Sequence, residues 1–233
     1  MPGHARFRLA RVQSVSKLGR DAWLDRRTAP TVDIIDVKDS LTSMTTSIDV
    51  LYPLAERRAG YVTTAQAAEV GVSRQQLSYL ARTGSLQRVA QGIYRLHRFP
   101  AQRFEDVIVA CLWAGEDAVA SHDTALAVYD LADAMPAVIH VSTPRPFRGQ
   151  RRGIAVHTAP LGDGERTERA GVPVTTVERT IADVLARSGE ELARSAAEQA
   201  LERGLVTRRR LHAALTGHGD LARPLLDLAG TQA

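Results

Sequence analysis

Two helix N-caps separated by a glycine turn constrain the fold of this chain more than any other sequence feature. Thr63 or Thr64 is the expected cap of a short helix over residues 65–70, and Ser73 is the expected cap of a second helix over residues 74–83. Serine and threonine hydroxyls accept hydrogen bonds from the free N–H groups of a first helical turn. The spacing therefore predicts a helix-turn-helix.

A further helix is predicted ahead of this pair. Apolar side chains recur there at three- and four-residue spacing, which places them on one helix face, and Gly60 closes the helix. Pro53 is tolerated because it lies close to the first turn. The apolar residues are Val50, Leu51, Leu54 and Ala55.

A β-hairpin is predicted directly after the three helices. Residues 86–89 and 93–96 have the composition of short strands, and Ala90, Gln91 and Gly92 between them suit a turn. Three short helices followed by a hairpin describe a winged helix-turn-helix. In such a fold the third helix enters the major groove of DNA and the wing lies on the phosphate backbone.

The third helix and the wing supply the candidate DNA contacts. Leu77 and Leu80 face the predicted core, which leaves the polar side chains of the helix toward solvent or DNA. Arg88 and Arg95 are expected to contact phosphates from the wing. The predicted DNA-binding residues are Ser73, Arg74, Gln75, Ser78, Tyr79, Arg82, Arg88, Gln91 and Arg95.

The charge pattern favours a nucleic-acid partner. The net charge is +4, and the stretch from Gly71 to Arg103 holds six arginines and neither aspartate nor glutamate. From Asp163 to Arg203, nine carboxylates outnumber six arginines, so that part is not built to lie on phosphate. A three-helix protein-binding module with solvated arginines is the alternative interpretation, which an acid-free surface disfavours.

The second half is predicted to mix helices and strands. Residues 104–114 have the apolar composition of a buried helix, and Ser121 is the expected cap of a helix reaching about Leu131. Residues 138–142 and 154–158 have the composition of strands.

The C-terminal end is predicted to be helical. Thr175 and Glu178 have the spacing of a capping box ahead of a helix with one apolar stripe. Residues 190–203 and 207–215 add two more helices. The stripe consists of Val177, Ile181, Val184 and Leu185.

The pattern changes near Pro100, where a basic helix-hairpin unit gives way to an apolar helix. We therefore predict an α+β protein with a winged helix-turn-helix at residues 44–99 and a mixed α/β domain at residues 100–233. Each half is expected to fold alone, and residues 44–99 are expected to bind DNA by themselves.

A basic loop joins the two predicted strands of the second half. Its arginines, interspersed with Pro144, Pro146 and Gly149, suit a mobile cationic loop that makes secondary contacts with DNA or RNA. A plain solvated loop explains the same residues equally well. The arginines are Arg145, Arg148, Arg151 and Arg152.

No catalytic residue, metal site or cofactor is predicted. His140 and His157 meet if their strands pair, but two imidazoles without a cysteine or carboxylate fall short of a metal site. His122 and Asp123 are explained by helix initiation. A nuclease would need spaced carboxylates and a lysine on a strand, and no lysine follows Met44. We therefore expect a binding protein rather than an enzyme.

The chain carries no sign of export. It has neither an apolar run of about eighteen residues nor the apolar stretch and small-residue cleavage site of a signal peptide. Its single cysteine, Cys111, lies in an apolar run, where a thiol serves as a small buried hydrophobe and has no disulfide partner. A cytoplasmic location without membrane contact is expected.

The first 43 residues differ from the rest in composition. Serine, threonine and aspartate are frequent, no helical or strand period is sustained, and both lysines of the chain, Lys17 and Lys38, fall here. We expect disorder in residues 1–43. Two interpretations stay open: a start assigned too early, with the protein beginning at Met44, or a disordered basic arm that tracks DNA.

Six of these segments together resemble one known family. They are residues 59–67, 71–74, 84–86, 88–96, 120–126 and 171–180. They resemble the AbiEi antitoxins of type IV toxin-antitoxin systems, in the winged domain and in the region that follows it. The resemblance covers the chain from about Val50 to Leu215.

The resemblance implies an antitoxin with two functions. Its winged domain would repress its own operon by binding double-stranded operator DNA, and its C-terminal half would counteract a nucleotidyltransferase toxin. A stand-alone regulator, whose second half senses a ligand or drives dimerisation, is the second hypothesis, and a nuclease guided by the winged domain is the third. A neighbouring nucleotidyltransferase gene would favour the antitoxin, and metal-dependent DNA cleavage the nuclease.

A chain that begins at Met44 is expected to fold and to bind DNA as well as the 233-residue form, because residues 1–43 show no pattern of a packed core. Thermal unfolding and DNA titration of the two forms measure this. Loss of folding in the shorter form would contradict the expectation.

Overall fold

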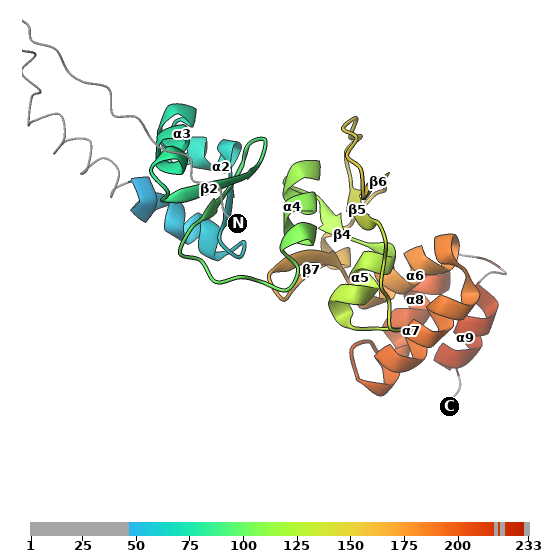
Figure 1. Cartoon of the computed structure of the whole chain (residues 1–233). Coiled ribbons are helices and arrows are strands. Elements are labelled where there is room, and N and C mark those ends of the chain that lie inside the picture. The colour runs from blue at the N-terminus through green and yellow to red at the C-terminus, as the bar shows by residue number, and fades with distance from the viewer. Residues whose placement is uncertain (1–46, 217–218, 220–221, 231–233) are drawn as a thin grey trace, which may run out of the picture. The chain divides into compact units, whose positions relative to one another are not determined.

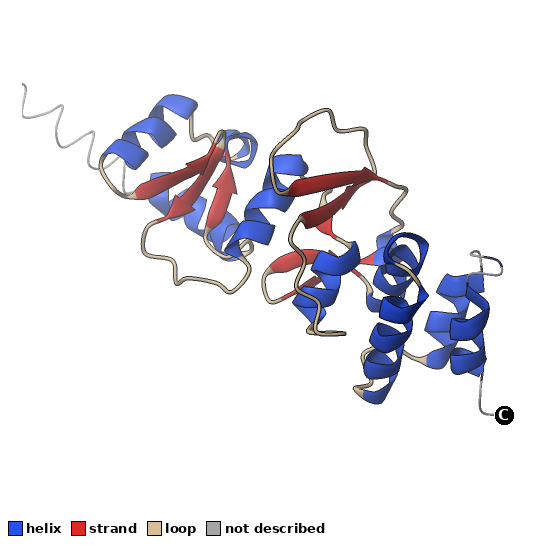
Figure 2. Ribbon diagram, turned by 45° about the vertical axis from the view of Figure 1, so that its right-hand side comes forward, coloured by secondary structure: helices blue, strands red, loops and turns tan. Residues whose placement is uncertain are grey.

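The computed structural model describes residues 47–216, 219 and 222–230 (Figure 1). They form an α+β protein with two separate sheets, as the sequence predicts (Figure 2). The predictions for residues 1–43 lie outside the described residues.

Three helices and a three-stranded sheet form the winged module, which we define as residues 47–98. The predicted helices and hairpin are confirmed, and an additional strand, β1, pairs with β3 to complete a sheet in the order β1-β3-β2. The sequence pattern does not predict β1, because three residues are too few to show an alternating period. The elements are the helix at 47–56, β1 (Tyr61–Thr63), α2 (Thr64–Glu69), α3 (Arg74–Arg82), β2 (Leu86–Ala90) and β3 (Ile93–Leu96).

Both helix starts in the helix-turn-helix carry a complete capping box. Thr63 Oγ1 accepts a hydrogen bond from the backbone N–H of Gln66 at 3.2 Å, and Gln66 Oε1 accepts one from the N–H of Thr63 at 3.1 Å. Ser73 and Gln76 repeat the arrangement at 3.2 and 2.8 Å. Each cap is worth about 1 kcal/mol, so the turn between the helices is held at both ends.

The wing is a tight hairpin that is anchored to the helix-turn-helix. Ala90 pairs with Ile93, so the turn consists of Gln91 and Gly92 and is one residue shorter than expected. The carbonyl oxygen of Gly92 accepts hydrogen bonds from the backbone nitrogen and the hydroxyl of Thr64, at 2.8 and 3.2 Å. The tip of the wing is therefore fixed to the start of α2.

The sheet of the winged module is covered on both faces. Leu86, Tyr94 and Leu96 belong to a core that the sheet forms with the three helices. Tyr61 and Ile93 are buried with apolar residues of the second half instead. The described residues of the winged module and of the second half accordingly belong to one compact unit. The independent folding of the two halves stays a prediction, and a break near residue 100 would uncover this second face.

A mixed five-stranded sheet, in the order β6-β5-β4-β8-β7, lies in the second half. β5 runs parallel to β6 and β4 runs parallel to β8, whereas the β4–β5 and β7–β8 pairs are antiparallel. The two predicted strands correspond to β5 and β6, and the other three escape prediction because they are short or polar. The strands are β4 (Val119–Ala120), β5 (Ile139–Thr143), β6 (Ile154–Thr158), β7 (Arg166–Arg169) and β8 (Val172–Thr175).

Helices cover this sheet and form the C-terminal end, where α6, α7, α8 and α9 lie side by side (Figures 1 and 2). The predicted apolar stripe of α6 is buried, as is Cys111 in α4, whose pKa burial raises to about 12. Among the described residues no helix is both long and apolar enough to cross a membrane. The helices are α4 (Glu105–Ala114), α5 (His122–Tyr129), α6 (Val177–Ser188), α7 (Glu190–Glu202), α8 (Arg208–Leu215) and α9 (Arg223–Gly230), with a 3₁₀ turn at Asp163–Glu165.

Two predicted caps differ in detail from the structure. Ser121 occupies the N-cap position of α5, but its hydroxyl makes no capping bond and lies 2.9 Å from Nδ1 of His122. The capping box assigned to Thr175 is wrong: Thr176 is the N-cap of α6, and Thr175 Oγ1 hydrogen-bonds Thr180 Oγ1 at 2.7 Å. In both cases another side chain takes the hydroxyl that the local pattern assigns to a helix end.

Gly60 is expected to tolerate no side chain, because its φ is +92° and a Cβ would lie 2.5 Å from Cβ of Phe99. Gly60→Ala should lower the free energy of unfolding by more than about 1 kcal/mol, measured by urea denaturation of the full chain. Gly164→Ala is the control: its Cβ meets no atom within 4 Å, so the effect should stay within about 0.5 kcal/mol. Equal stabilities of the two variants would contradict the assignment.

Candidate nucleic-acid interface

Helix α3 has a buried apolar face and an opposite polar face that is exposed to solvent. Leu77 and Leu80 are at most 1% exposed and fix α3 on the core of the winged module, as predicted. Side chains one helical turn apart on the other face are therefore available together to one groove. The predicted contacts that are exposed on α3 are Arg74, Gln75, Ser78 and Arg82.

Ser73 and Tyr79, also predicted as DNA contacts, have structural partners. The Ser73 hydroxyl accepts the capping bond from Gln76, so only its hydrogen is left for a phosphate oxygen. Tyr79 is half-buried, and the Arg82 guanidinium lies 5.4 Å from the centroid of its ring. This cation–π contact orients Arg82 and leaves its planar set of N–H donors for phosphate or guanine.

The wing offers Arg88 and Gln91, which are both exposed. Gln91 lies in the turn that Thr64 anchors, and Arg88 is paired with Tyr94 across the hairpin. Because the turn is tied to the start of α2, these polar side chains are held in a fixed relation to α3. The structure thus brings most of the predicted contacts onto one module.

Arg95 is the exception, and its prediction as a phosphate contact is corrected by its surroundings. Arg95 pairs with Gln87 in the hairpin and so faces away from Arg88, toward the second half. Its Nη2 donates to Glu105 Oε1 and to the carbonyl oxygen of Phe99, both at 2.9 Å, and its side chain is only 13% exposed. Side chains alternate between the two faces of a strand, but sequence spacing alone does not show which face is buried. In the structure Arg95 lies on the buried face.

Charge supports the remaining interface. Among the ion pairs of the described residues, none involves Arg74, Arg82 or Arg88. Exposed ion pairs add little to stability, so three arginines without acidic partners are better suited to releasing counterions from a phosphate backbone than to holding the fold.

The basic loop of the second half is anchored at its middle. Phe147 packs edge-on against Trp113, with ring centroids 4.8 Å apart, and Arg145 lies 3.5 Å from Asp117. Composition alone suggests a mobile loop. In the structure, however, the loop is anchored to α4 through Phe147 and Trp113. All four predicted secondary contacts are exposed on it: Arg145, Arg148, Arg151 and Arg152.

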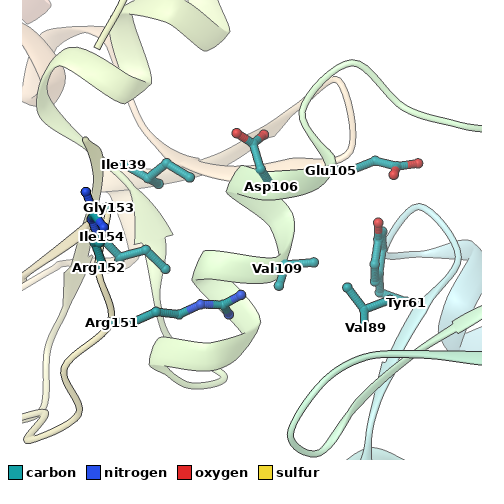
Figure 3. A pocket seen from close by; sticks show the side chains of 10 residues that line it. All are labelled: Tyr61, Val89, Glu105, Asp106, Val109, Ile139, Arg151, Arg152, Gly153 and Ile154. Carbon is teal, nitrogen blue, oxygen red and sulfur yellow. The ribbon is translucent and has the colours of Figure 1, made fainter. Parts of the chain in front are cut away.

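A pocket of about 520 Å³ lies beside this loop. Figure 3 shows the Arg151 side chain extending toward α4, with Glu105 and Asp106 on the same helix and Tyr61 opposite. Burial, followed by the nearby Glu105 carboxylate, raises the pKa of Tyr61 to about 12, so the phenol stays neutral. Walls that carry both signs of charge do not select a polyanion, so α3 and the wing stay the predicted interface.

A capped helix-turn-helix followed by an anchored hairpin defines a winged helix-turn-helix protein, the class to which the first half belongs. Residues 49–97 match the model of the family described as "Transcriptional regulator, AbiEi antitoxin". This match confirms the resemblance to the AbiEi antitoxin family over the winged module. The winged module is thus similar to that of a DNA-binding transcriptional regulator.

One solved structure similar to this chain is that of the RV2827C protein from Mycobacterium tuberculosis. The two are 19% identical, the alignment covers 79% of this chain and 78% of that one, and the TM-score is 0.47. No curated protein matches this chain.

Replacing Arg74, Arg82 or Arg88 by alanine is expected to weaken DNA binding, because each guanidinium is exposed and lacks an acidic partner. A residue on phosphate should lower the slope of log K against log salt by about one, and a residue on guanine should relax sequence preference at a cost of about 1 to 3 kcal/mol. Fluorescence anisotropy with the upstream DNA of its own gene, at several salt concentrations, measures both.

Arg95→Ala is the matched control within the same hairpin. It should lower the melting temperature, because Glu105 loses its partner, and leave the salt slope unchanged. If Arg95→Ala lowers the slope while the three other variants leave binding intact, the interface lies on the other face of the wing.

Proposed function

We propose that this protein is an antitoxin that represses its own operon through the winged module and counteracts a nucleotidyltransferase toxin through its second half. The DNA-binding part of the proposal is supported by one arrangement above all. Among the described residues, Arg74, Arg82 and Arg88 of α3 and the wing have no acidic partner. They lie on a scaffold with two capping boxes and an anchored turn.

Repression follows if the module binds double-stranded DNA where the polymerase must pass. Arg74, Gln75 and Ser78 lie on the first two turns of α3, the end of a recognition helix that meets base edges in this class. Arg88 and Gln91 lie in the wing, where backbone contacts set register rather than sequence preference. An operator beside its own gene is the binding site we propose.

The second half is proposed to act through its surface, by binding rather than by catalysis. It carries the more acidic stretch of the chain, from Asp163 to Arg203, which disfavours direct contact with phosphates. It also shares a buried surface with the winged module through Tyr61 and Ile93. A partner bound to the second half could therefore influence DNA binding by the winged module. Action on DNA and on a cellular toxin fits a cytoplasmic location.

The two activities should be separable by point variants in the full chain, which keep the shared surface intact. Arg74→Ala/Arg82→Ala should release repression of a reporter placed behind the upstream DNA. The same variant should still rescue growth of cells that express the proposed nucleotidyltransferase toxin. Arg209→Ala, an exposed arginine on α8, is the control for repression and should retain it.

The outcomes divide the hypotheses. Residues 100–233 alone should rescue growth without repressing, if that half folds alone. Failure of the full chain to rescue, with repression intact, would overturn the antitoxin and leave a stand-alone regulator. Cleavage of the upstream DNA by the purified protein with a divalent metal ion would overturn a purely binding role.

A further inference from the structure

Three histidines from separate elements of the second half come together in the fold. His140 lies on β5, His157 lies on the adjacent strand β6, and His122 is the first residue of α5. One potential ligand nitrogen from each lies within 4.8 Å of the others. His122 and His140 are buried and His157 is half-buried, so the cluster is shielded from bulk water.

The strand register explains why two of them meet. His140 pairs with Ala155 and His157 pairs with Ser142 across parallel strands, which places both imidazoles on one face of the sheet. The third is added by the backbone of His122, whose φ of +51° is in the left-handed region that residues other than glycine seldom adopt. From the sequence we expect only His140 and His157 to meet, and the structure adds His122 as a third imidazole.

The spacing suits a shared ion. His140 Nδ1 and His157 Nε2 are 3.0 Å apart, and the rings of His122 and His157 are stacked with centroids 4.2 Å apart. Two imidazole nitrogens bound to one tetrahedral Zn²⁺ at about 2.0–2.1 Å are about 3.3 Å from each other. A shift of a few tenths of an ångström would therefore give the His140 and His157 nitrogens the separation of two zinc ligands. The His122 nitrogen, which lies within 4.8 Å of the other two, would have to move closer to share the same ion.

Burial favours the neutral form of the three imidazoles, because a charged ring loses hydration when it is buried. Burial, followed by the neighbouring imidazoles and by Arg187, lowers the pKa of His157 to about 4. Burial and His140 lower the pKa of His122 to about 4, and burial lowers that of His140. Neutral imidazoles keep a lone pair for a cation.

A hydroxyl network supports one ligand from behind. His122 Nδ1 lies 2.9 Å from Ser121 Oγ, which also accepts a hydrogen bond from Ser142 at 2.8 Å. In the tautomer that donates Nδ1–H to Ser121, Nε2 of His122 is the free ligand atom. Metal-bound histidines in proteins commonly donate their second nitrogen in this way, which orients the ring.

We propose that His122, His140 and His157 form a three-histidine binding site for a divalent transition metal ion, with Zn²⁺ as the ion it fits. Imidazole nitrogens select ions of this class over Mg²⁺ or Ca²⁺, which prefer oxygen. Among the described residues no carboxylate or thiol joins the cluster, so the fourth ligand is water or a group from a partner. The ion would tie the start of α5 to β5 and β6.

Charged neighbours act in both directions on such an ion. The carboxylates of Asp123 and Asp183 raise the pKa of nearby histidines of the cluster and so favour a cation there. Arg187 and Arg179 act in the opposite sense. Asp183 and Arg179 form an ion pair at 2.8 Å, so their opposite charges largely cancel at the cluster. Asp123 accepts a hydrogen bond from Ser188.

Cobalt is the probe for this site, because Co²⁺ replaces Zn²⁺ and its visible absorption reports geometry. The full chain, freed of metal by a chelator and without a polyhistidine tag, should bind one Co²⁺ per chain with the intense bands of tetrahedral coordination. Zn²⁺ should displace it and should raise the melting temperature. Weak octahedral bands, or no metal-dependent change in melting temperature, would overturn the site.

Variants locate the ion. His157→Gln and His140→Gln should each weaken Zn²⁺ at least ten-fold in calorimetry, and Ser121→Ala should weaken it about 10- to 100-fold without removing a ligand. His97→Gln, an exposed histidine of the winged module, should leave it unchanged. Equal loss with His97→Gln, or full binding in folded His157→Gln and His140→Gln, would place the metal elsewhere.

Discussion

The sheet of the winged module is covered on both faces, and this double burial decides which of its side chains can reach DNA. Leu86, Tyr94 and Leu96 face the helices, whereas Tyr61 and Ile93 pack against the second half. Arg95 shares that second face, where Glu105 receives it at 2.9 Å. The face toward the second half is thereby closed, and the exposed residues that we predict to contact DNA lie on α3 and the outer part of the hairpin.

Local hydrogen bonds then give the confined surface its geometry. Two capping boxes hold the turn between α2 and α3, and Thr64 holds the wing through the carbonyl of Gly92. A recognition helix and a wing fixed to the same short helix move together, so their arginines meet the groove and the backbone in one register. The match of residues 49–97 to a family of transcriptional regulators agrees with this geometry and with arginines that have no acidic partner among the described residues.

In the second half, side-chain partners rather than free helix ends take two hydroxyls, and the sheet brings distant imidazoles together. Ser121 stands at a helix start, yet it supports His122, and Thr175 turns to Thr180 rather than to a free helix end. The mixed sheet sets β5 and β6 side by side and so joins two histidines that are 17 residues apart. The third joins them only because α5 begins with a left-handed residue.

Much of the architecture is predictable from the sequence, because caps, glycines and apolar periods act over three or four residues. These local rules located α2, α3, both wing strands, β5, β6 and the apolar stripe of α6, together with the exposed positions of Arg74 and Arg82. The short strands β1, β4, β7 and β8 carry too little period to be recognised alone. Whether Arg95 faces phosphate or Glu105, and whether His122 joins His140 and His157, depends on contacts between residues distant in the chain. Only the tertiary structure decided these two points. Alternation along a strand assigns side chains to two faces, but packing against other elements determines which face is buried and which is exposed.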